Sequence, residues 1–444
     1  MLLLALLGVG PAVGLTPDRV LVIVNGADPD SAAVGARYAE LRPGVLTLDL
    51  ANPTLVGRPT IDYDTFREAL QRPLRRYLVE RPGLAERILC LALTKGIPHR
   101  LDDLNRPGVG DRAETMREEW LERGDFTAAS VDSELTLLWQ DLPLNDRGGF
   151  YDSKADGFIL NPYHGERRPF AEFDRAHLTR RKRFIDILQA EDHGRIWQAG
   201  WQAVTPREAP ARLTPGDIYL VVRLDGPTLP ATLAALDRAQ DINFDQSLGV
   251  ILLDANAAAE LDQADYVRAA QLLRRHGWGV VLDRTENFLT GAEVRRPLIA
   301  YASYGANDLG LDAPTSTGYI GTFRFAPGAI FNTLESFNGR AFGGLGDRPG
   351  RPQTQLADFI AAGGTLGIGN VWEPFSFSAA QNEVLLDAFL NRGLTWAEAA
   401  YASLFSLSWQ QIVVGDPLAR ARVLRPPAGS PNPFNPAPAA GSGR

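Results

Sequence analysis

Residues 298–308 read LIAYASYGAND, an apolar run of strand length that ends in a small, polar loop with a glycine. The same pattern recurs twice downstream, in AIFNTLESFNGR at 329–340 and in TLGIGNVWEP at 365–374. A helical pattern over 353–362 separates the second loop from the third run. In an open parallel sheet, the loops at the carboxyl ends of the strands line one rim, where ligands bind. We therefore expect these three loops to meet in space and to form a site.

Apolar runs of similar length recur along most of the chain. Continuous runs of this kind are typical of strands that are buried on both faces of a parallel sheet. Helical patterns at 30–40 and 63–78 lie between some of them, and right-handed crossovers place such helices on the faces of the sheet. The runs cover residues 19–26, 45–50, 88–93, 218–222, 250–253 and 280–282. The predicted fold class is α/β, a parallel-sheet sandwich with helices on both faces, arranged in two α/β halves.

Four segments are predicted along the chain. Residues 1–15 have the apolar stretch and small residues of a signal peptide, although no Lys or Arg precedes the stretch, so a misassigned start codon or a buried first strand is the alternative. Residues 16–215 form the N-terminal α/β half, with an irregular insertion from about residue 100. Residues 216–424 form the C-terminal half. Residues 425–444 are rich in Pro, Ala, Gly and Ser, a composition that favours disorder. The mature chain is expected outside the cytoplasm, either periplasmic or secreted.

The composition excludes several classes of function. The 444 residues are 45% hydrophobic, which is ample for a buried core, and the net charge of −8 argues against binding to a phosphate backbone. Cys90 is the single cysteine and lies in an apolar run, which indicates a buried structural thiol and excludes an internal disulfide. No segment approaches the roughly 20 apolar residues that span a bilayer. We expect neither nucleic-acid binding nor a membrane span in the mature chain.

Six short motifs carry a resemblance to known proteins. They are ASYGAND at 302–308, PGAI with SFNGR at 327–340, SWQQIVVGDPL at 408–418, LTKGIP at 93–98, ASVDSEL at 129–135 and VRLDGP at 222–227. Together they resemble an uncharacterised bacterial family that is distantly related to gingipain-type and caspase-like cysteine peptidases. The resemblance extends from about Arg19 to Leu418. It implies a caspase-like fold for the C-terminal half.

The same resemblance locates a candidate catalytic site. Those peptidases place a His-Gly after one strand and a catalytic Cys after the next. Here the His position falls at Ala306 or Asn307, and the Cys position at about Ser336. Neither an alanine nor an asparagine side chain acts as a base near neutral pH, and a serine is a poor nucleophile without one. The resemblance thus implies a peptidase-like module without the usual dyad, with Ser336, Asn307 and Asp308 at the corresponding positions.

A hydrolase that uses Ser336 as its nucleophile is the alternative. His99 follows an apolar strand of the first half, and Asp308 and Glu335 lie in neighbouring loops, so these residues could form a Ser/His/acid set. The sequence does not give the distances among them. Whether the chain is an enzyme or a binding module is therefore left open.

Further residues of the strand-end loops are candidate ligand contacts. Arg223 and Asp225 could clamp a ligand at a strand end, or form an ion pair with each other. Trp372 and Glu373 offer an aromatic wall and a carboxylate, which suit a peptide or sugar groove but could equally close the core. The predicted ligand-binding residues are Arg223, Asp225, Glu335, Arg340, Trp372 and Glu373.

No cofactor or metal is predicted. Residues 25–30 follow the first strand but contain one glycine, where a phosphate-cradling loop needs several. The histidines show no paired ligand spacing. Asp132 and Glu134 could bind a cation or order a loop, and a charged turn or a helix N-terminus explains them equally well. The partner is unknown, and a peptide or a protein ligand is the candidate.

Overall fold

The computed structural model describes residues 14–101, 129–140, 159–179, 213–255, 260–285, 289–305, 320–342, 355–372, 374 and 378–425. Several predictions made from the sequence concern residues outside this set. They include Ala306, Asn307, Asp308 and Glu373, most of the leader at 1–15, the tail after Arg425, and most of the insertion that begins near residue 100.

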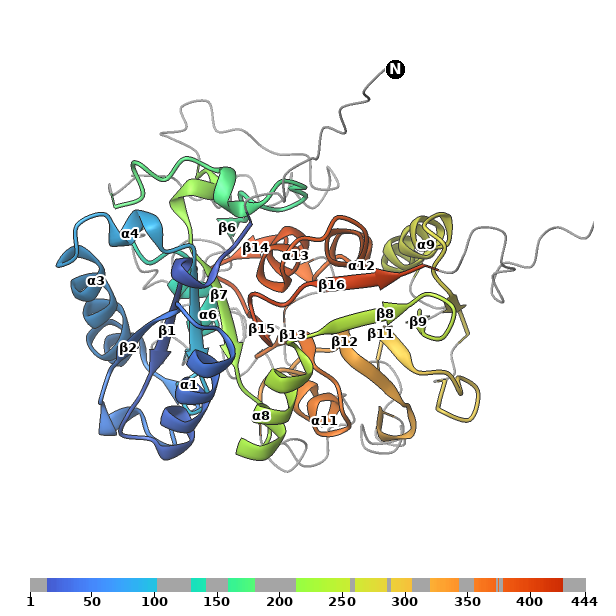
Figure 1. Ribbon diagram of the computed structural model, residues 1–444, viewed down its shortest axis with the longest axis horizontal. Helices are drawn as coiled ribbons and strands as arrows, with labels where there is room; N and C mark the ends of the chain where they lie inside the picture. The colour runs from blue at the N-terminus through green and yellow to red at the C-terminus, as the bar shows by residue number, and fades with distance from the viewer. Residues whose placement is uncertain are drawn as a thin grey trace, which may run out of the picture.

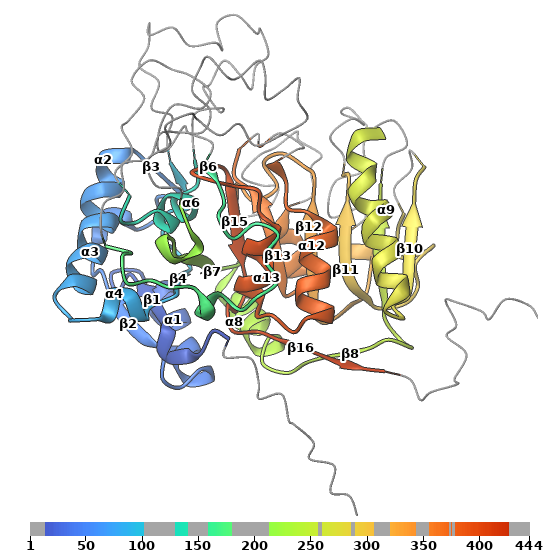
Figure 2. The ribbon, with the colours of Figure 1, turned by 90° about the horizontal axis from the view of Figure 1, so that it is seen from above.

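One large sheet organises the described part of the chain. Its ten strands lie in the order β10-β9-β11-β12-β13-β15-β7-β4-β1-β2, and Figure 2 shows them side by side from β2 at one edge to β10 at the other. The pairs are parallel except for β13 with β15, which is antiparallel. The predicted α/β class with a mainly parallel sheet is confirmed.

The strands of this sheet lie close to the predicted apolar runs. They are β1 (Val20–Val24), β2 (Leu46–Asp49), β4 (Cys90–Thr94), β7 (Leu220–Leu224), β9 (Val250–Asp254), β10 (Val280–Asp283), β11 (Leu298–Ser303), β12 (Phe325–Thr333), β13 (Leu366–Asn370) and β15 (Gln411–Val414). Every residue of β1, β4, β7 and β9 is buried, as continuous apolar runs indicate for a sheet covered on both faces.

Helices cover both faces of the sheet. They are α1 (Pro29–Leu41), α2 (Tyr63–Phe66), α3 (Arg72–Val79), α4 (Leu84–Arg87), α6 (Val131–Thr136), α8 (Leu229–Arg238), α9 (Glu260–Arg275), α11 (Leu356–Ala361), α12 (Asn382–Leu386) and α13 (Trp396–Ser403). In Figure 1, α8 and α11 lie on one side of the strands, and α9, α12 and α13 lie on the other. Alternate residues of β9 face different cores, because Leu252 packs in one apolar cluster while Ile251 and Leu253 pack in the other.

Three small sheets complete the described elements. β3 (Thr60–Ile61) pairs with β5 (Arg100–Leu101), β6 (Ile159–Leu160) with β14 (Ser406–Leu407), and β8 (Ile242–Asp245) with β16 (Ala421–Leu424). The pair of β8 with β16 is parallel, and it holds the last described segment against residues 242–245. The sequence patterns did not single out these short strands, whose pairing depends on contacts between distant segments.

Three elements differ from the sequence prediction. β7 extends to Leu224, two residues beyond the predicted end, so Arg223 lies inside the strand rather than after it. β12 begins at Phe325, four residues earlier than predicted, and its register against β11 shifts around Gly328, which has a φ of +89°. The single helix expected over 63–78 is α2, a π-helical segment at Arg67–Gln71 and α3 in direct succession.

The sheet continues across the predicted boundary between the two halves. β7, the first strand of the second half, pairs with β4 of the first half and with β15. Residues 129–140, which fall inside the predicted insertion, are buried against this region. No helix among the described residues is both long enough and apolar enough to span a bilayer.

Candidate functional site

The loops after β11, β12 and β13 meet at one rim of the sheet, as the sequence predicts. These strands are neighbours and parallel, so their carboxyl ends share one edge. The Asn370 backbone N–H donates to Asn338 Oδ1 at 2.6 Å, and the Asn370 side-chain amide donates to the carbonyl oxygen of Glu335 at 3.0 Å. The backbone N–H of Phe337 donates to the carbonyl oxygen of Trp372 at 2.9 Å. The last two loops are therefore bonded to each other directly.

Glu335 occupies the interior of this junction. Its side chain is fully buried and accepts a hydrogen bond from Thr333 Oγ1 at 2.9 Å. Gly305 at the end of β11 has a φ of +81°, and a Cβ there would overlap the Glu335 side chain. The first loop thus approaches the second only because residue 305 is a glycine. Glu335 serves as an internal connector of the loops, and it does not line the cavity described below.

Ser336, the predicted nucleophile, is also buried, with 5% of its surface exposed. Phe337, the residue after it, has a φ of +60°, which is unusual for a non-glycine residue and turns the chain sharply at this point. Asn307 and Asp308 lie outside the described residues, so their geometry relative to Ser336 is not given. The assignment of Ser336, Asn307 and Asp308 as catalytic positions therefore stays a prediction.

The side chains of Arg340 and Trp372 lie together. Arg100, which the sequence analysis did not single out, lies beside the same ring. The guanidinium carbon of Arg340 is 4.8 Å from the centroid of the Trp372 ring, and that of Arg100 is 5.4 Å from it. Arginine stacks well on an indole because the ring face is electron-rich. The Trp372 side chain is nine-tenths buried, and its indole N–H has no hydrogen-bond partner among the described residues.

His99 links the first half of the chain to the loop after β12. Its Nε2 lies 2.6 Å from the carbonyl oxygen of Arg340, and because a carbonyl can only accept, Nε2 carries the proton. The ring also packs edge-on against Phe342. Burial lowers the pKa of His99 well below its usual value, and the nearby Arg223 lowers it further. The imidazole is therefore neutral at pH 7.

Arg223 is an internal ion-pair partner. Its side chain is fully buried, and its Nε donates to Asp132 Oδ2 at 2.9 Å. The guanidinium also donates to the carbonyl oxygens of Ile97 and Pro98. Burial raises the pKa of Asp132 to about 6 even though Arg223 opposes this shift. Of the two roles considered for Arg223, the structure provides the ion pair and gives no surface through which a ligand could reach the guanidinium.

Asp225 lies at the carboxyl end of β7 and does border a cavity. Lys95 Nζ is 3.4 Å from Asp225 Oδ1 and donates to the carbonyl oxygen of Gly226 at 2.7 Å. Arg223 Nη1 is 3.6 Å from the other carboxylate oxygen. Burial raises the pKa of Asp225, while Lys95 and Arg223 act in the opposite direction.

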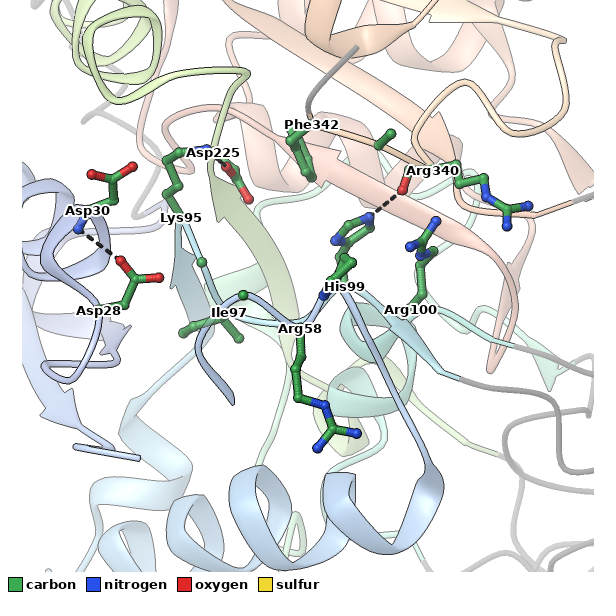
Figure 3. Close-up of a pocket in the computed structure, with 14 residues that line it drawn as sticks. Asp28, Asp30, Arg58, Lys95, Ile97, His99, Arg100, Asp225, Arg340 and Phe342 are labelled. Atoms are coloured by element: carbon green, nitrogen blue, oxygen red, sulfur yellow. Dashed lines mark hydrogen bonds and ion pairs between the residues drawn. The ribbon is translucent and has the colours of Figure 1, made fainter. Parts of the chain in front are cut away.

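The cavity has a volume of about 560 Å³ and lies where loops from both halves converge. Figure 3 shows Asp28, Asp30, Lys95 and Asp225 on one side and His99, Arg100 and Arg340 on the other, with Arg58 between them. Its lining is Asp28, Asp30, Gly57, Arg58, Pro59, Lys95, Gly96, Ile97, His99, Arg100, Asp225, Arg340, Ala341 and Phe342. Small-ligand sites have volumes of roughly 300–1,000 Å³. This cavity has the size and the polar lining of such a site.

Asp132 and Glu134, the residues considered for a cation, lie in the first turn of α6. Asp132 pairs with Arg223, and Ser408 Oγ donates to Glu134 Oε1. Ser130 caps α6 and also donates to the carbonyl oxygen of Gln411 at 2.7 Å. The described residues contain no group of three or more His, Cys, Asp or Glu side chains that could hold a metal ion.

Most of the cavity was missed by the sequence reading. Asp225 and Arg340 were predicted ligand contacts and do line it, and His99 was considered only as a base. Asp28 and Lys95 follow β1 and β4, so the rule that sites form at the carboxyl ends of parallel strands could have found them. Arg58 precedes the short strand β3, and no sequence signal places it here.

Comparison with known proteins gives fold neighbours only. No family model matches the chain, and no curated protein sequence matches it. Among solved structures, it is similar to the Arg-specific cysteine proteinase gingipain R at 10% identity and a TM-score of 0.45, covering 93% of this chain and 81% of the other. It is also similar to the Saccharomyces cerevisiae separase–securin complex, at 12% identity and a TM-score of 0.33. That match covers 46% of this chain and 14% of the separase-complex chain.

Proposed function

We propose that this chain is an exported, peptidase-like module that binds a peptide or a segment of a protein and does not use a His/Cys dyad. The observation that carries the proposal is the cavity lined by loops of both halves, with four basic and three acidic side chains at its wall. A wall that carries charged groups of both signs can bind the charged groups of a ligand through ion pairs and hydrogen bonds. A charged, hydrogen-bonding ligand is the occupant that this wall favours.

The absence of the dyad is supported by the residues at its positions. An alanine or an asparagine stands where a histidine would be needed, and Ser336 is 95% buried. Glu335 beside it is enclosed at the loop junction and bonded to Thr333. A carboxylate in that position supports the loops and is not exposed to an incoming substrate.

The proposal is tested by retention of peptides on the immobilised, purified chain. A library of random tetrapeptides is passed over it, and the retained peptides are identified by mass spectrometry. We expect retention to fall at least tenfold in Arg58→Glu, which reverses an exposed charge at the cavity, and to persist in Arg76→Glu on α3. Retention of no peptide, or equal retention by both variants, would contradict binding at this cavity.

A hydrolase that uses Ser336 remains the second candidate. One observation favours it: His99 of the first half contacts the backbone of the loop that carries Ser336. A serine-directed fluorophosphonate probe separates the two functions. The binding module predicts no covalent labelling. Labelling that persists in Ser247→Ala and disappears in Ser336→Ala would establish the hydrolase instead.

Export is tested with the full-length chain in a bacterial host. We expect the chain to reach the periplasm or the medium with its first residues removed, and a variant without residues 1–15 to remain in the cytoplasm. Mass spectrometry of the N-terminus reports the cleavage. An intact N-terminus on cytoplasmic protein would contradict export.

A further inference from the structure

We propose that the cavity binds a bipolar ligand, a short peptide with a cationic group against Asp28 and Asp30 and a free carboxylate against Arg100 and Arg340. This inference rests on the proposed function and names the class of ligand. It follows from the separation of charge within the cavity wall, which Figure 3 shows along its length.

The acidic end is formed by Asp28 and Asp30. Asp28 Oδ1 accepts the backbone N–H of Asp30 at 2.9 Å and so caps α1. Its Oδ2 lies against Gly96, where a Cβ would overlap the carboxylate. Within the described residues neither carboxylate forms an ion pair. The third acid, Asp225, is already neutralised by Lys95 and Arg223, so Asp28 and Asp30 carry the uncompensated charge at this end.

The basic end is formed by Arg100 and Arg340, and Arg58 lies between the two ends in Figure 3. Arg100 and Arg340 share the Trp372 ring, and stacking on a ring orients the planar guanidinium while its edge N–H groups stay in the plane. Arg58 is exposed at the cavity mouth. The indole N–H of Trp372 adds a buried donor beside these groups. Arginine is suited to a carboxylate because its fork of donors matches the two oxygens.

The spacing of the two ends sets the length of the ligand. The segment from Lys95 to Arg100 runs along the cavity between them. Gly96 and Arg100 are four residues apart, so their Cα atoms lie within about 14 Å of each other. An extended chain rises about 3.4 Å per residue. A peptide of at most about four residues therefore suffices to span the ends, and a peptide of this size suits a volume of about 560 Å³.

Calorimetric titration of the full chain with three tripeptides tests the inference. The first is Lys-Ala-Ala with a free carboxylate, the second is its C-terminal amide, and the third is acetyl-norleucyl-Ala-Ala, which keeps the carboxylate and has no cation. We expect the first to bind at least tenfold more tightly than either of the others. Arg340→Gln should reduce the difference in affinity between the first and second peptides. Asp30→Asn should reduce the difference in affinity between the first and third.

Matched variants at Arg76 on α3 and at Glu80, the C-cap of this helix, serve as controls. Arg76→Gln and Glu80→Gln remove exposed charges away from the cavity lining. Neither variant should change the differences in affinity among the three peptides. Equal affinity for the three peptides would overturn the proposal of a bipolar ligand. Differences in affinity that the cavity variants do not alter would overturn it as well. The wild type could retain tetrapeptides that Arg58→Glu does not retain, while none of the three tripeptides binds. In that case the ligand class is wrong and the binding function stands. If neither binds, both proposals fall.

Discussion

At the scale of single residues, burial separates the charged groups that hold the fold together from those that face a ligand. Asp416 and Arg223 are fully buried, and both are bonded to elements distant in sequence. Arg58 and Asp30 retain exposed surface at the cavity. A buried charge must find its partners inside the protein because water no longer solvates it. Substitution of the two groups should therefore affect different properties, stability for the first and ligand affinity for the second.

Asp416→Asn should destabilise the protein by about 3 kcal/mol. The buried carboxylate accepts hydrogen bonds from Tyr38 Oη at 2.7 Å and from Arg42 Nε at 2.8 Å, and it ties α1 to the segment after β15. An asparagine has no charge to offset that of Arg42. Urea denaturation measures the free energy of unfolding. Asp237→Asn, which removes an exposed partner of Arg37, should cost less than about 1 kcal/mol, and equal losses in both variants would contradict this account.

Asp254→Asn should become more stable relative to the wild type as the pH rises from about 4 to about 7. Burial, with a smaller contribution from Asp283, raises the pKa of Asp254 to about 7. In this window the folded state holds a proton that the unfolded state has released, so a rise in pH destabilises the wild type. The relative gain should reach about 4 kcal/mol near pH 7 and then level off.

Asp245→Asn is the control for this pH dependence, to be followed by urea denaturation at a series of pH values. Hydrogen bonds from Ser247 lower the pKa of Asp245, so the wild-type carboxylate stabilises the fold above about pH 4. This variant should lose stability relative to the wild type as the pH rises. A parallel response of the two variants would show that the Asp254 carboxyl is not the group responsible.

At the scale of elements, the rim depends on how closely three strand-end loops approach one another. β11, β12 and β13 bring their carboxyl ends together, and the hydrogen bonds of Asn370 and Asn338 join the last two loops. Gly305 allows the first loop to approach Glu335. The positions of Arg340 and Phe342 at the cavity follow from this junction, because both residues continue the loop after β12.

Gly305→Ala should therefore disturb the junction more than an ordinary glycine substitution does. Gly305 has a φ of +81° and the Glu335 side chain in the space of a Cβ, whereas Gly363 has a φ of +104° and open space there. Gly363→Ala should cost about 1–2 kcal/mol, from the left-handed backbone alone. Gly305→Ala should cost about 1–3 kcal/mol more than that, because overpacking adds this amount. Equal losses of unfolding free energy in the two variants, measured by urea denaturation, would show that the Glu335 side chain moves aside without cost.

At the scale of the whole molecule, the two predicted halves share one sheet. β7 lies between β4 and β15, so the first half without it would expose an edge of β4, and the second half would expose an edge of β7. Arg223 on β7 also holds Asp132 and the loop after β4. The cavity draws Asp28 and Lys95 from one half and Asp225 and Arg340 from the other. Sheet and cavity therefore both require the complete chain.

Separate expression of residues 14–215 and 216–425 should give two fragments that do not unfold cooperatively, because each lacks the strand that completes its sheet. Co-expression of the fragments should restore a single cooperative transition in thermal denaturation, followed by circular dichroism. The intact chain is the reference. A cooperative transition in residues 216–425 alone would contradict the shared-sheet account and make the second half an independent domain.

The sequence by itself determined the α/β class, the main strands and the meeting of the loops after residues 303, 333 and 370. Continuous apolar runs such as Val20–Val24 and Val250–Asp254 identify buried strands because such strands have no solvated face. Strand-end loops are predictable for a similar reason, since parallel strands bring their carboxyl ends to one edge. A capping box formed by Thr395 and Glu398 begins α13, and the Thr-x-x-Glu spacing is a local signal of a helix start.

The tertiary structure decided which charged residues are buried and which reach the cavity. The segment from Arg223 to Asp225 shows the difference, because β7 continues two residues beyond its predicted end. Arg223 therefore lies inside the strand and is fully buried, while Asp225 follows the strand end and lines the cavity. Arg58, Arg100 and Arg340 are distant in sequence, and only folding of both halves brings them to one wall. Local patterns report the periodicity of a strand or a helix. They carry no information on which distant side chains share a partner, because that depends on strand order and on the packing of the loops.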